Sequence, residues 1–426
     1  MKYLINSAWM LAEQVLTIIS GIFVGVYLAR CIGPEKFGIL SYVLALVSLL
    51  TVFSRLGMES ILVRELARNK ENASSYMGTA FYLMAMGALA SALIMNLLVF
   101  FFENDWNIQI YVMIVSLGVV FQSFLVIDYN FQSQIKAGFS SFSRSISLIV
   151  SSIAKIILAM SDASLIYLVI AHALDYVIIA LFLWVAHCVA KQPSFFNCFE
   201  KTVVRPLLSS SFPMIISGVA TIALSKTDQI MIKNMLDAEK LGVYVAASKI
   251  YDGWNTLVFV LSMSILPILV HLKNHSGTFY ECRLKQFFAA FFWISILFSL
   301  LVSLTADNLM SILFGARYSN SGATLAILIW ASPLAAVGFV ATRYLIVEGL
   351  QRKIAMRNWI AVGLNVPLNY IFIGIYGIEG AAGATLISLF VAHYVIDYLD
   401  KDLKHLAKIK NAAFFLRLRT ERSLDE

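Results

Sequence analysis

Twelve apolar stretches follow one another along this 426-residue chain, and each has about the 20 residues that cross the hydrocarbon core of a bilayer. We place the spans at 7–30, 38–58, 79–102, 109–128, 142–160, 163–187, 208–233, 241–270, 284–305, 322–347, 354–376 and 379–399. No connection between them is long enough to form a separate domain. The pattern predicts an all-α integral membrane protein with about twelve transmembrane helices.

Composition supports a multi-pass membrane protein. The chain is 60% hydrophobic and 13% charged, whereas soluble domains have roughly 45–50% apolar and about 25% charged residues. The net charge of +7 does not indicate nucleic-acid binding, because the basic residues lie in loops between spans. The four cysteines show neither metal-site nor disulfide spacing. We therefore expect no metal and no cofactor.

Lysines and arginines are distributed unevenly between the two sets of loops. Of 32 basic residues, 22 fall in the even-numbered connections and the two ends, five in the odd-numbered connections and five within spans. Basic loops face the cytoplasm. Both termini are therefore predicted to be cytoplasmic, in the inner (plasma) membrane of a bacterium.

Two short motifs recur and suggest an internal repeat. Glu35–Gly38 after the first span matches Glu239–Gly242 after the seventh, and Ala171–Asp175 resembles Ala392–Asp397. Two six-span halves would share one orientation and be related by a parallel pseudo-two-fold axis. The predicted divisions are an N-terminal lobe (1–190), a cytoplasmic linker (191–207), a C-terminal lobe (208–400) and a basic cytoplasmic tail (401–426). Apolar residues in the tail suggest an interfacial amphipathic segment.

Several strings distributed over nearly the whole chain resemble one family of membrane proteins. They are Asn6-Ser-Ala-Trp9, Ile32-Gly-Pro-Glu-Lys-Phe-Gly38, Arg55-Leu-Gly57, Val63-Arg-Glu-Leu-Ala67, Thr227-Asp-Gln-Ile-Met-Ile232, Gly242-Val-Tyr-Val-Ala-Ala247, Gly349-Leu-Gln351, Asn365-Val-Pro-Leu-Asn369 and Tyr376-Gly-Ile-Glu-Gly-Ala-Ala382. The chain resembles the Wzx-type flippases of O-antigen and related polysaccharide repeat units. These belong to the superfamily that also holds multidrug exporters and the lipid II flippase.

The resemblance implies a two-lobed bundle around a hydrophilic, often cationic cavity. It also implies a cargo, an undecaprenyl-pyrophosphate-linked oligosaccharide that alternating access moves to the periplasmic leaflet as part of lipopolysaccharide biosynthesis. Membrane lipids, and the polymerase and chain-length proteins of the same pathway, would be its partners. A multidrug or metabolite exporter is the first alternative, and a membrane polysaccharide polymerase is the second. Because the chain has no phosphate-cradling loop for ATP, we expect a non-enzymatic, ion-coupled transporter.

Charged residues inside apolar spans are costly and are therefore candidates for function. In the seventh and eighth spans, helix geometry places four of them in one layer, about 10–12 Å below the outer surface: Lys226, Asp228, Lys249 and Asp252. Lys155 could join this layer from the first lobe. The charges could be neutralising pairs, or the lysines could bind anionic cargo while an aspartate handles protons.

The remaining candidates lie nearer the cytoplasm or within single helices. Arg55 and Arg343 could bind a pyrophosphate bidentately, or each could extend to the interface. Glu13 lies at a similar depth in the first span. His172 and Asp175 share a helix face and could relay protons or form a structural pair. The last pair, Asn365 and Asn369, is predicted to hydrogen-bond between helices, with a sugar contact as the alternative.

Overall fold

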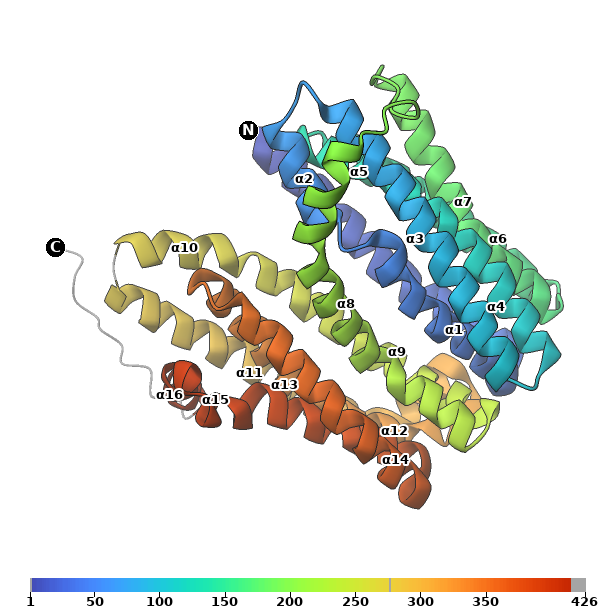
Figure 1. Ribbon diagram of the computed structural model, residues 1–426. Helices are drawn as coiled ribbons and strands as arrows, with labels where there is room; N and C mark the ends of the chain where they lie inside the picture. The colour runs from blue at the N-terminus through green and yellow to red at the C-terminus, as the bar shows by residue number, and fades with distance from the viewer. Residues whose placement is uncertain (1, 276, 415–426) are drawn as a thin grey trace. The chain divides into compact units, whose positions relative to one another are not determined.

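The computed structural model describes residues 2–275 and 277–414, and within these ranges every regular element is a helix. The chain divides into two compact units, Met1–Lys233 and Asn234–Glu426. The first contains α1 (Lys2–Arg55), α2 (Glu59–Arg68), α3 (Ala73–Phe102), α4 (Trp106–Val119), η1 (Val120–Phe124), α5 (Leu125–Ser133), α6 (Ala137–Met160), α7 (Leu165–Val189) and most of α8 (Lys201–Met235) (Figure 1).

The second unit contains the remaining elements. They are α9 (Ala238–Met263), α10 (Ile265–His275), α11 (Gly277–Phe314), η2 (Ala316–Tyr318), α12 (Ser321–Leu328), α13 (Ala331–Val347), α14 (Gln351–Phe390), the π-helical η3 (Val391–Val395), α15 (Ile396–Leu399), η4 (Lys401–Leu403) and α16 (Lys404–Phe414).

Helix α1 reverses its direction at Gly33, where φ is 78° and ψ is 168°. Glu13 interacts electrostatically with Asp128, and Arg55 interacts with the adjacent Tyr129. In one straight helix Glu13 and Arg55 would be about 63 Å apart. Both halves of α1 therefore lie near α5. The predicted first and second spans are the two halves of α1.

Helix α14 reverses in the same way at Gly377, where φ is 63° and ψ is −137°. Arg357 and Asp397 form an ion pair although 40 residues separate them, a distance of about 60 Å along a straight helix. The predicted eleventh span and most of the twelfth are the two halves of this element.

Ten helical segments of the described chain are long and apolar enough to cross a membrane. Two of these ten contain the reversals at Gly33 and Gly377, and each reversal divides its segment into two candidate spans. Each predicted span overlaps one of them. The chain is a multi-pass membrane protein, and the predicted all-α fold class is confirmed.

Each unit has its own hydrophobic core. In the first, Met58, Leu62, Phe131 and Phe195 are fully buried where α2, α5 and the α7–α8 connection meet. In the second, α10, α11, α13 and α16 pack around a core that includes Leu269, Phe288, Leu345 and Leu406. These cores fix the helices whose polar residues are described below.

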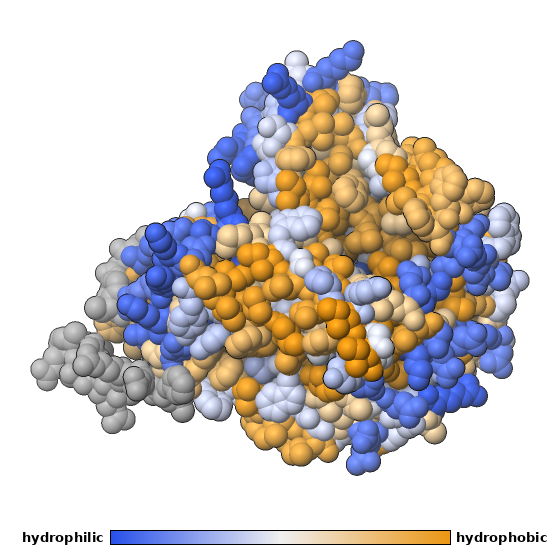
Figure 2. All heavy atoms as spheres, turned by 60° about the horizontal axis from the view of Figure 1, so that its bottom comes forward, coloured by the Kyte–Doolittle hydropathy of each residue, from blue (hydrophilic) through white to orange (hydrophobic). Residues whose placement is uncertain are grey.

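Large apolar side chains also cover much of the outer surface. Phe102 and Leu304 are 84% and 76% exposed, an arrangement that is stable where lipid replaces water. Hydrophobic residues form broad continuous areas on the face in Figure 2, and hydrophilic residues gather near its edges. The surface therefore agrees with the membrane assignment.

The structure adds detail to two predicted segments, the linker and the tail. Helix α8 begins at Lys201, so the last part of the predicted linker 191–207 is helical. Its 35 residues extend about 52 Å, longer than the bilayer core, so its polar first turns can project beyond the membrane. The tail helix α16 buries Leu406, Ile409 and Ala413 against α11 and its neighbours, and the interfacial location of the tail stays a prediction. Residues 415–426 lie outside the described residues.

Candidate substrate site

Lys155 and Asp175 form an ion pair between α6 and α7. Lys155 is buried, and Asp175 also accepts a hydrogen bond from Ser151. On the same face of α7, the His172 Nδ1 atom lies 3.5 Å from an Asp175 oxygen. The structure thus brings together the predicted His172–Asp175 pair and the predicted cation Lys155, which is neutralised here by Asp175.

Glu13 takes part in a second ionic cluster that we did not predict. Arg144 of α6 lies 3.5 Å from Glu13 and forms an ion pair with the fully buried Asp128 of α5. Ser140 donates a further hydrogen bond to Asp128. Asp128 ends an apolar run and Arg144 begins another, so only packing between the helices reveals that they are partners.

Arg55, at the end of α1, is exposed and faces a neutral partner. Its Nε atom donates to Gln122 Oε1 at 3.0 Å, and Ser54 Oγ donates to the same oxygen at 2.9 Å. No carboxylate of the described residues lies within ion-pair distance of Arg55. Its charge is therefore available to an anion.

Arg343 of α13 is 8% exposed and is also held by neutral groups. Its Nε and Nη2 atoms donate to the buried Ser262 hydroxyl at 3.3 and 3.2 Å. The guanidinium carbon lies 5.1 Å from the centre of the Phe259 ring, a cation–π contact. Within the described residues Arg343 has no ion pair, which leaves a positive charge uncompensated inside the second unit.

The four charges of the seventh and eighth spans belong to different compact units. Lys226 and Asp228 lie in the first, while Lys249 and Asp252 lie in the second. Lys226 is half-buried and forms no ion pair with any described residue, and Asp228 is buried. Lys249 and Asp252 each have an interaction partner. The predicted single layer of charges stays a prediction.

Asn365 and Asn369 are both buried in α14. Asn369 Nδ2 donates to Asn365 Oδ1 at 2.8 Å, while Asn365 Nδ2 and Asn369 Oδ1 find no hydrogen-bond partner among the described residues. The pair therefore bonds along one helix, and it keeps a donor and an acceptor unused.

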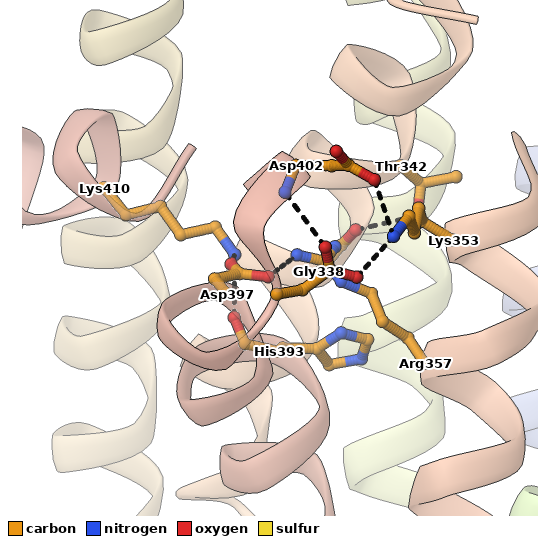
Figure 3. Close-up of polar contacts among 9 residues, drawn as sticks. Gly338, Thr342, Lys353, Arg357, His393, Asp397, Asp402 and Lys410 are labelled. Carbon is orange, nitrogen blue, oxygen red and sulfur yellow. Dashed lines mark hydrogen bonds and ion pairs between the residues drawn. The ribbon is translucent and has the colours of Figure 1, made fainter. Parts of the chain in front are cut away.

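A third ionic cluster, absent from our predictions, joins the first part of α14 to α15 and the tail helix α16 (Figure 3). Asp397 lies between Arg357 and Lys410 and accepts hydrogen bonds from both, at 2.6 Å from Lys410. All three side chains are at most 2% exposed. Lys410 also donates to the His393 backbone oxygen at 2.7 Å. The cluster holds two cations and one carboxylate.

The neighbouring tail residues are nearer the surface. Lys353 contacts Asp400 at 2.5 Å and Asp402 at 2.9 Å. The hydrogen bond from Lys353 lowers the pKa of Asp400 below its ordinary value. These contacts secure the chain between the last span and α16.

The two copies of the histidine–aspartate motif do not occupy equivalent positions. Asp175 pairs with Lys155, five residues before the end of α6, whereas Asp397 pairs with Arg357, six residues after the start of α14. The two pairs thus lie near opposite ends of their helix hairpins. The histidine–aspartate match therefore gives less support to the repeat than the match between Glu35–Gly38 and Glu239–Gly242. Each of those two motifs directly follows the first predicted span of its half. The parallel pseudo-symmetry stays a prediction.

Comparison with known proteins identifies the fold and the family. The structure is similar to the lipid II flippase MurJ in an inward closed conformation, with a TM-score of 0.75 and 16% identity over 99% of this chain and 94% of that one. It is similar to an inward-facing multidrug resistance MATE family transporter, with a TM-score of 0.70 and 14% identity over 93% and 96% of the two chains. These likenesses establish the fold of the MOP superfamily.

A third similar structure is a MOP superfamily transporter from Pyrococcus furiosus, with a TM-score of 0.62 and 14% identity over 97% of this chain and 96% of that one. For that protein, reverse polarity of the binding pocket suggests a different function. No curated protein matches the sequence. The family model described as "Polysaccharide biosynthesis protein" matches residues 4–273. The chain belongs to this family of polysaccharide biosynthesis proteins.

Proposed function

We propose that the protein is a flippase for an undecaprenyl-pyrophosphate-linked oligosaccharide, such as an O-antigen repeat unit. It moves this lipid from the cytoplasmic to the periplasmic leaflet of the bacterial inner membrane by alternating access. Family membership supports a role in polysaccharide biosynthesis, and the MurJ-like fold supports a lipid-linked substrate. The protein acts as a transporter rather than as an enzyme.

The buried, unneutralised Arg343 is the observation that carries this proposal. A cation in a membrane-spanning segment is unfavourable by ~3 kcal/mol or more unless a partner compensates it. Lys155, Arg144 and Arg357 each have a carboxylate partner, but Arg343 has Ser262 and Phe259. A pyrophosphate is an anion that guanidinium binds bidentately, and its arrival supplies the missing charge. A site for cationic drugs would be acidic instead.

Arg55 is a second anion-binding residue in this proposal. Its exposed guanidinium with a glutamine partner makes it suitable for the first contact with the head group at the cytoplasmic face. Lys226 and Lys249 contribute positive charge along the path, and Asn365 and Asn369 contact sugar through their unused polar atoms.

The Lys155–Asp175–His172 cluster is the coupling site in this proposal. Protonation of Asp175 would remove the charge that holds Lys155 and would thereby loosen α6 from α7. Asp175→Asn should reduce transport while leaving binding of the lipid intact. If transport by D175N responds to the proton gradient as wild type does, this role is excluded.

Deletion of the gene tests the main proposal. We expect lipid-linked repeat units to accumulate on the cytoplasmic leaflet while surface polysaccharide is lost. A polymerase defect would leave single repeat units on the periplasmic side, and an exporter defect would change drug sensitivity alone. Complementation with Arg343→Gln should fail, and Arg343→Lys should restore part of the output because it keeps the charge but not the bidentate geometry.

A further inference from the structure

An apolar pocket in the first unit lies beside the 3₁₀ segment η1 and near the end of α7. Its volume is about 300 Å³, the lower end of the range for ligand sites. It is lined by Phe121, Phe124, Val177, Ala180, Leu181, Trp184 and Phe196. None of these side chains is charged, so the pocket is suited to a hydrocarbon ligand.

The α7–α8 connection forms a fixed wall of this pocket. Phe195 is fully buried and anchors the connection, and Tyr82 Oη donates to the Phe196 carbonyl at 2.7 Å. The Phe196 ring packs against Trp184 with ring centres 5.1 Å apart. The pocket is therefore held by contacts on two sides.

The opening of the pocket is on the outer surface of the first unit. Phe121 and Leu181 are 40% and 57% exposed, and in a membrane such surfaces meet lipid. Trp184 lies five residues before Val189, the end of α7, so the pocket is near the membrane face that we predict to be cytoplasmic. A chain of about ten carbon atoms would fill it, since each such group occupies about 30 Å³, as a water molecule does.

The same 3₁₀ segment connects the pocket to Arg55. Phe121 and Phe124 line the pocket, while Gln122 between them is 2% exposed and accepts the hydrogen bond from Arg55 Nε. Short 3₁₀ stretches within a longer helix often mark hinges. A ligand with an anionic head and a long apolar chain could therefore contact Arg55 with its head and the pocket with its chain, and η1 lies at both contacts.

We propose that this pocket binds part of the polyprenyl chain of the lipid carrier while Arg55 contacts its phosphate, an assignment that rests on the proposed function. Insertion of the chain sets the position of η1 and thereby that of Gln122 and Arg55. The protein thus selects a polyprenyl lipid over the phospholipids that surround it.

Binding to the purified full-length protein tests this proposal. Native mass spectrometry would be used to titrate three separate probes: undecaprenol, undecaprenyl phosphate and phosphatidylglycerol. Leu181→Trp places a bulky ring at the pocket opening. Leu93→Trp is the matched control, because Leu93 of α3 is similarly exposed, at 63%, and does not line the pocket.

We expect Leu181→Trp to weaken undecaprenol binding about tenfold, equivalent to about 1.4 kcal/mol, and Leu93→Trp to leave it unchanged. Arg55→Gln should weaken undecaprenyl phosphate but not undecaprenol. Ala180→Phe, which fills the pocket from within, should repeat the effect of Leu181→Trp.

Wild-type undecaprenol affinity in both pocket variants, or equal binding of phosphatidylglycerol, would overturn the assignment. The result is separable from that of the main proposal, because undecaprenol carries no sugar and needs no transport. If the protein binds undecaprenol selectively but the deletion strain still makes normal surface polysaccharide, the two proposals separate. The pocket would then be a polyprenyl site, and the flippase role would be refuted.

Discussion

Buried cations in this chain fall into two groups according to the groups that face them. Arg357 belongs to the first, because its guanidinium is nearly inaccessible and bonds to the Asp397 carboxylate. Arg343 belongs to the second, because its neighbours are a hydroxyl and an aromatic ring. Removing one partner of a buried pair leaves an uncompensated charge, whereas removing a charge that lacks a partner does not.

Removing the carboxylate beside Arg357 and removing Arg343 itself should therefore have opposite consequences. Asp397→Asn leaves Arg357 and Lys410 buried without a carboxylate and should lower the free energy of unfolding by about 3–5 kcal/mol, while Arg343→Gln should change it by less than about 1 kcal/mol. Transport should fall at least about tenfold in Arg343→Gln, a loss of about 1.4 kcal/mol of interaction. Thermal unfolding in detergent and the amount of surface polysaccharide measure the two effects. A strongly destabilised Arg343→Gln protein would show that the residue is structural.

Asp400 gives the tail a dependence on pH. Its pKa is lowered in the folded protein because Lys353 donates a hydrogen bond to it. The unfolded chain therefore binds more protons in acid, so this contribution is complete above the ordinary aspartate value of about 3.9 and is lost as the pH falls through the folded pKa. The difference in melting temperature between wild type and Lys353→Met should shrink below about pH 4. A difference that stays constant from about pH 6 to about pH 3 would exclude the mechanism.

At the scale of elements, two glycines turn single helices into hairpins. Gly377 combines φ of 63° with ψ of −137°, a conformation that residues with a Cβ atom avoid. Among the atoms of the described residues, a Cβ there would meet only a Glu379 oxygen, at 3.8 Å. The need for glycine at this position therefore comes from the backbone and not from crowding.

Alanine at Gly377 should accordingly lower the free energy of unfolding by about 1–3 kcal/mol. Gly363 of the same helix is the matched control, because it has an ordinary helical φ and an added Cβ would have no atom of the described chain within 4 Å. Gly363→Ala should be neutral or stabilising by about 0.5–1 kcal/mol. Denaturation of both variants in the same detergent makes the comparison, and equal stability would remove the assigned role of Gly377.

At the scale of the whole molecule, the orientation in the membrane is open to a direct test. The α6–α7 turn at Asp162 is predicted to face the periplasm, and Cys188 at the end of α7 the cytoplasm. The four cysteines are free, so variants that retain one thiol are feasible. In intact cells an impermeant maleimide should label Asp162→Cys in a cysteine-free background and should not label the variant that retains Cys188. The reverse labelling pattern would show that the chain has the opposite orientation in the membrane.

Local composition was sufficient to predict the apolar spans and their order. A span needs about 20 apolar residues wherever it lies in the chain, so each could be recognised without its neighbours. The reversals at Gly33 and Gly377 fall between predicted spans for the same reason, since a polar or glycine-containing turn interrupts the apolar run. The pair His172 and Asp175 was found because helix periodicity brings residues three apart onto one face.

The partners of the charged residues were decided by tertiary structure. Composition marks Lys155 and Arg343 alike as costly charges in a membrane, yet Asp175 neutralises the first while a hydroxyl and a ring face the second. The pairing of Arg357 with Asp397 spans 40 residues, and helix periodicity carries no information over that separation. Sequence alone thus determined the order and apolar character of the membrane-spanning segments, because those depend on contact with lipid. Packing between helices determined which charges are compensated, because an ion pair forms only where two particular faces meet.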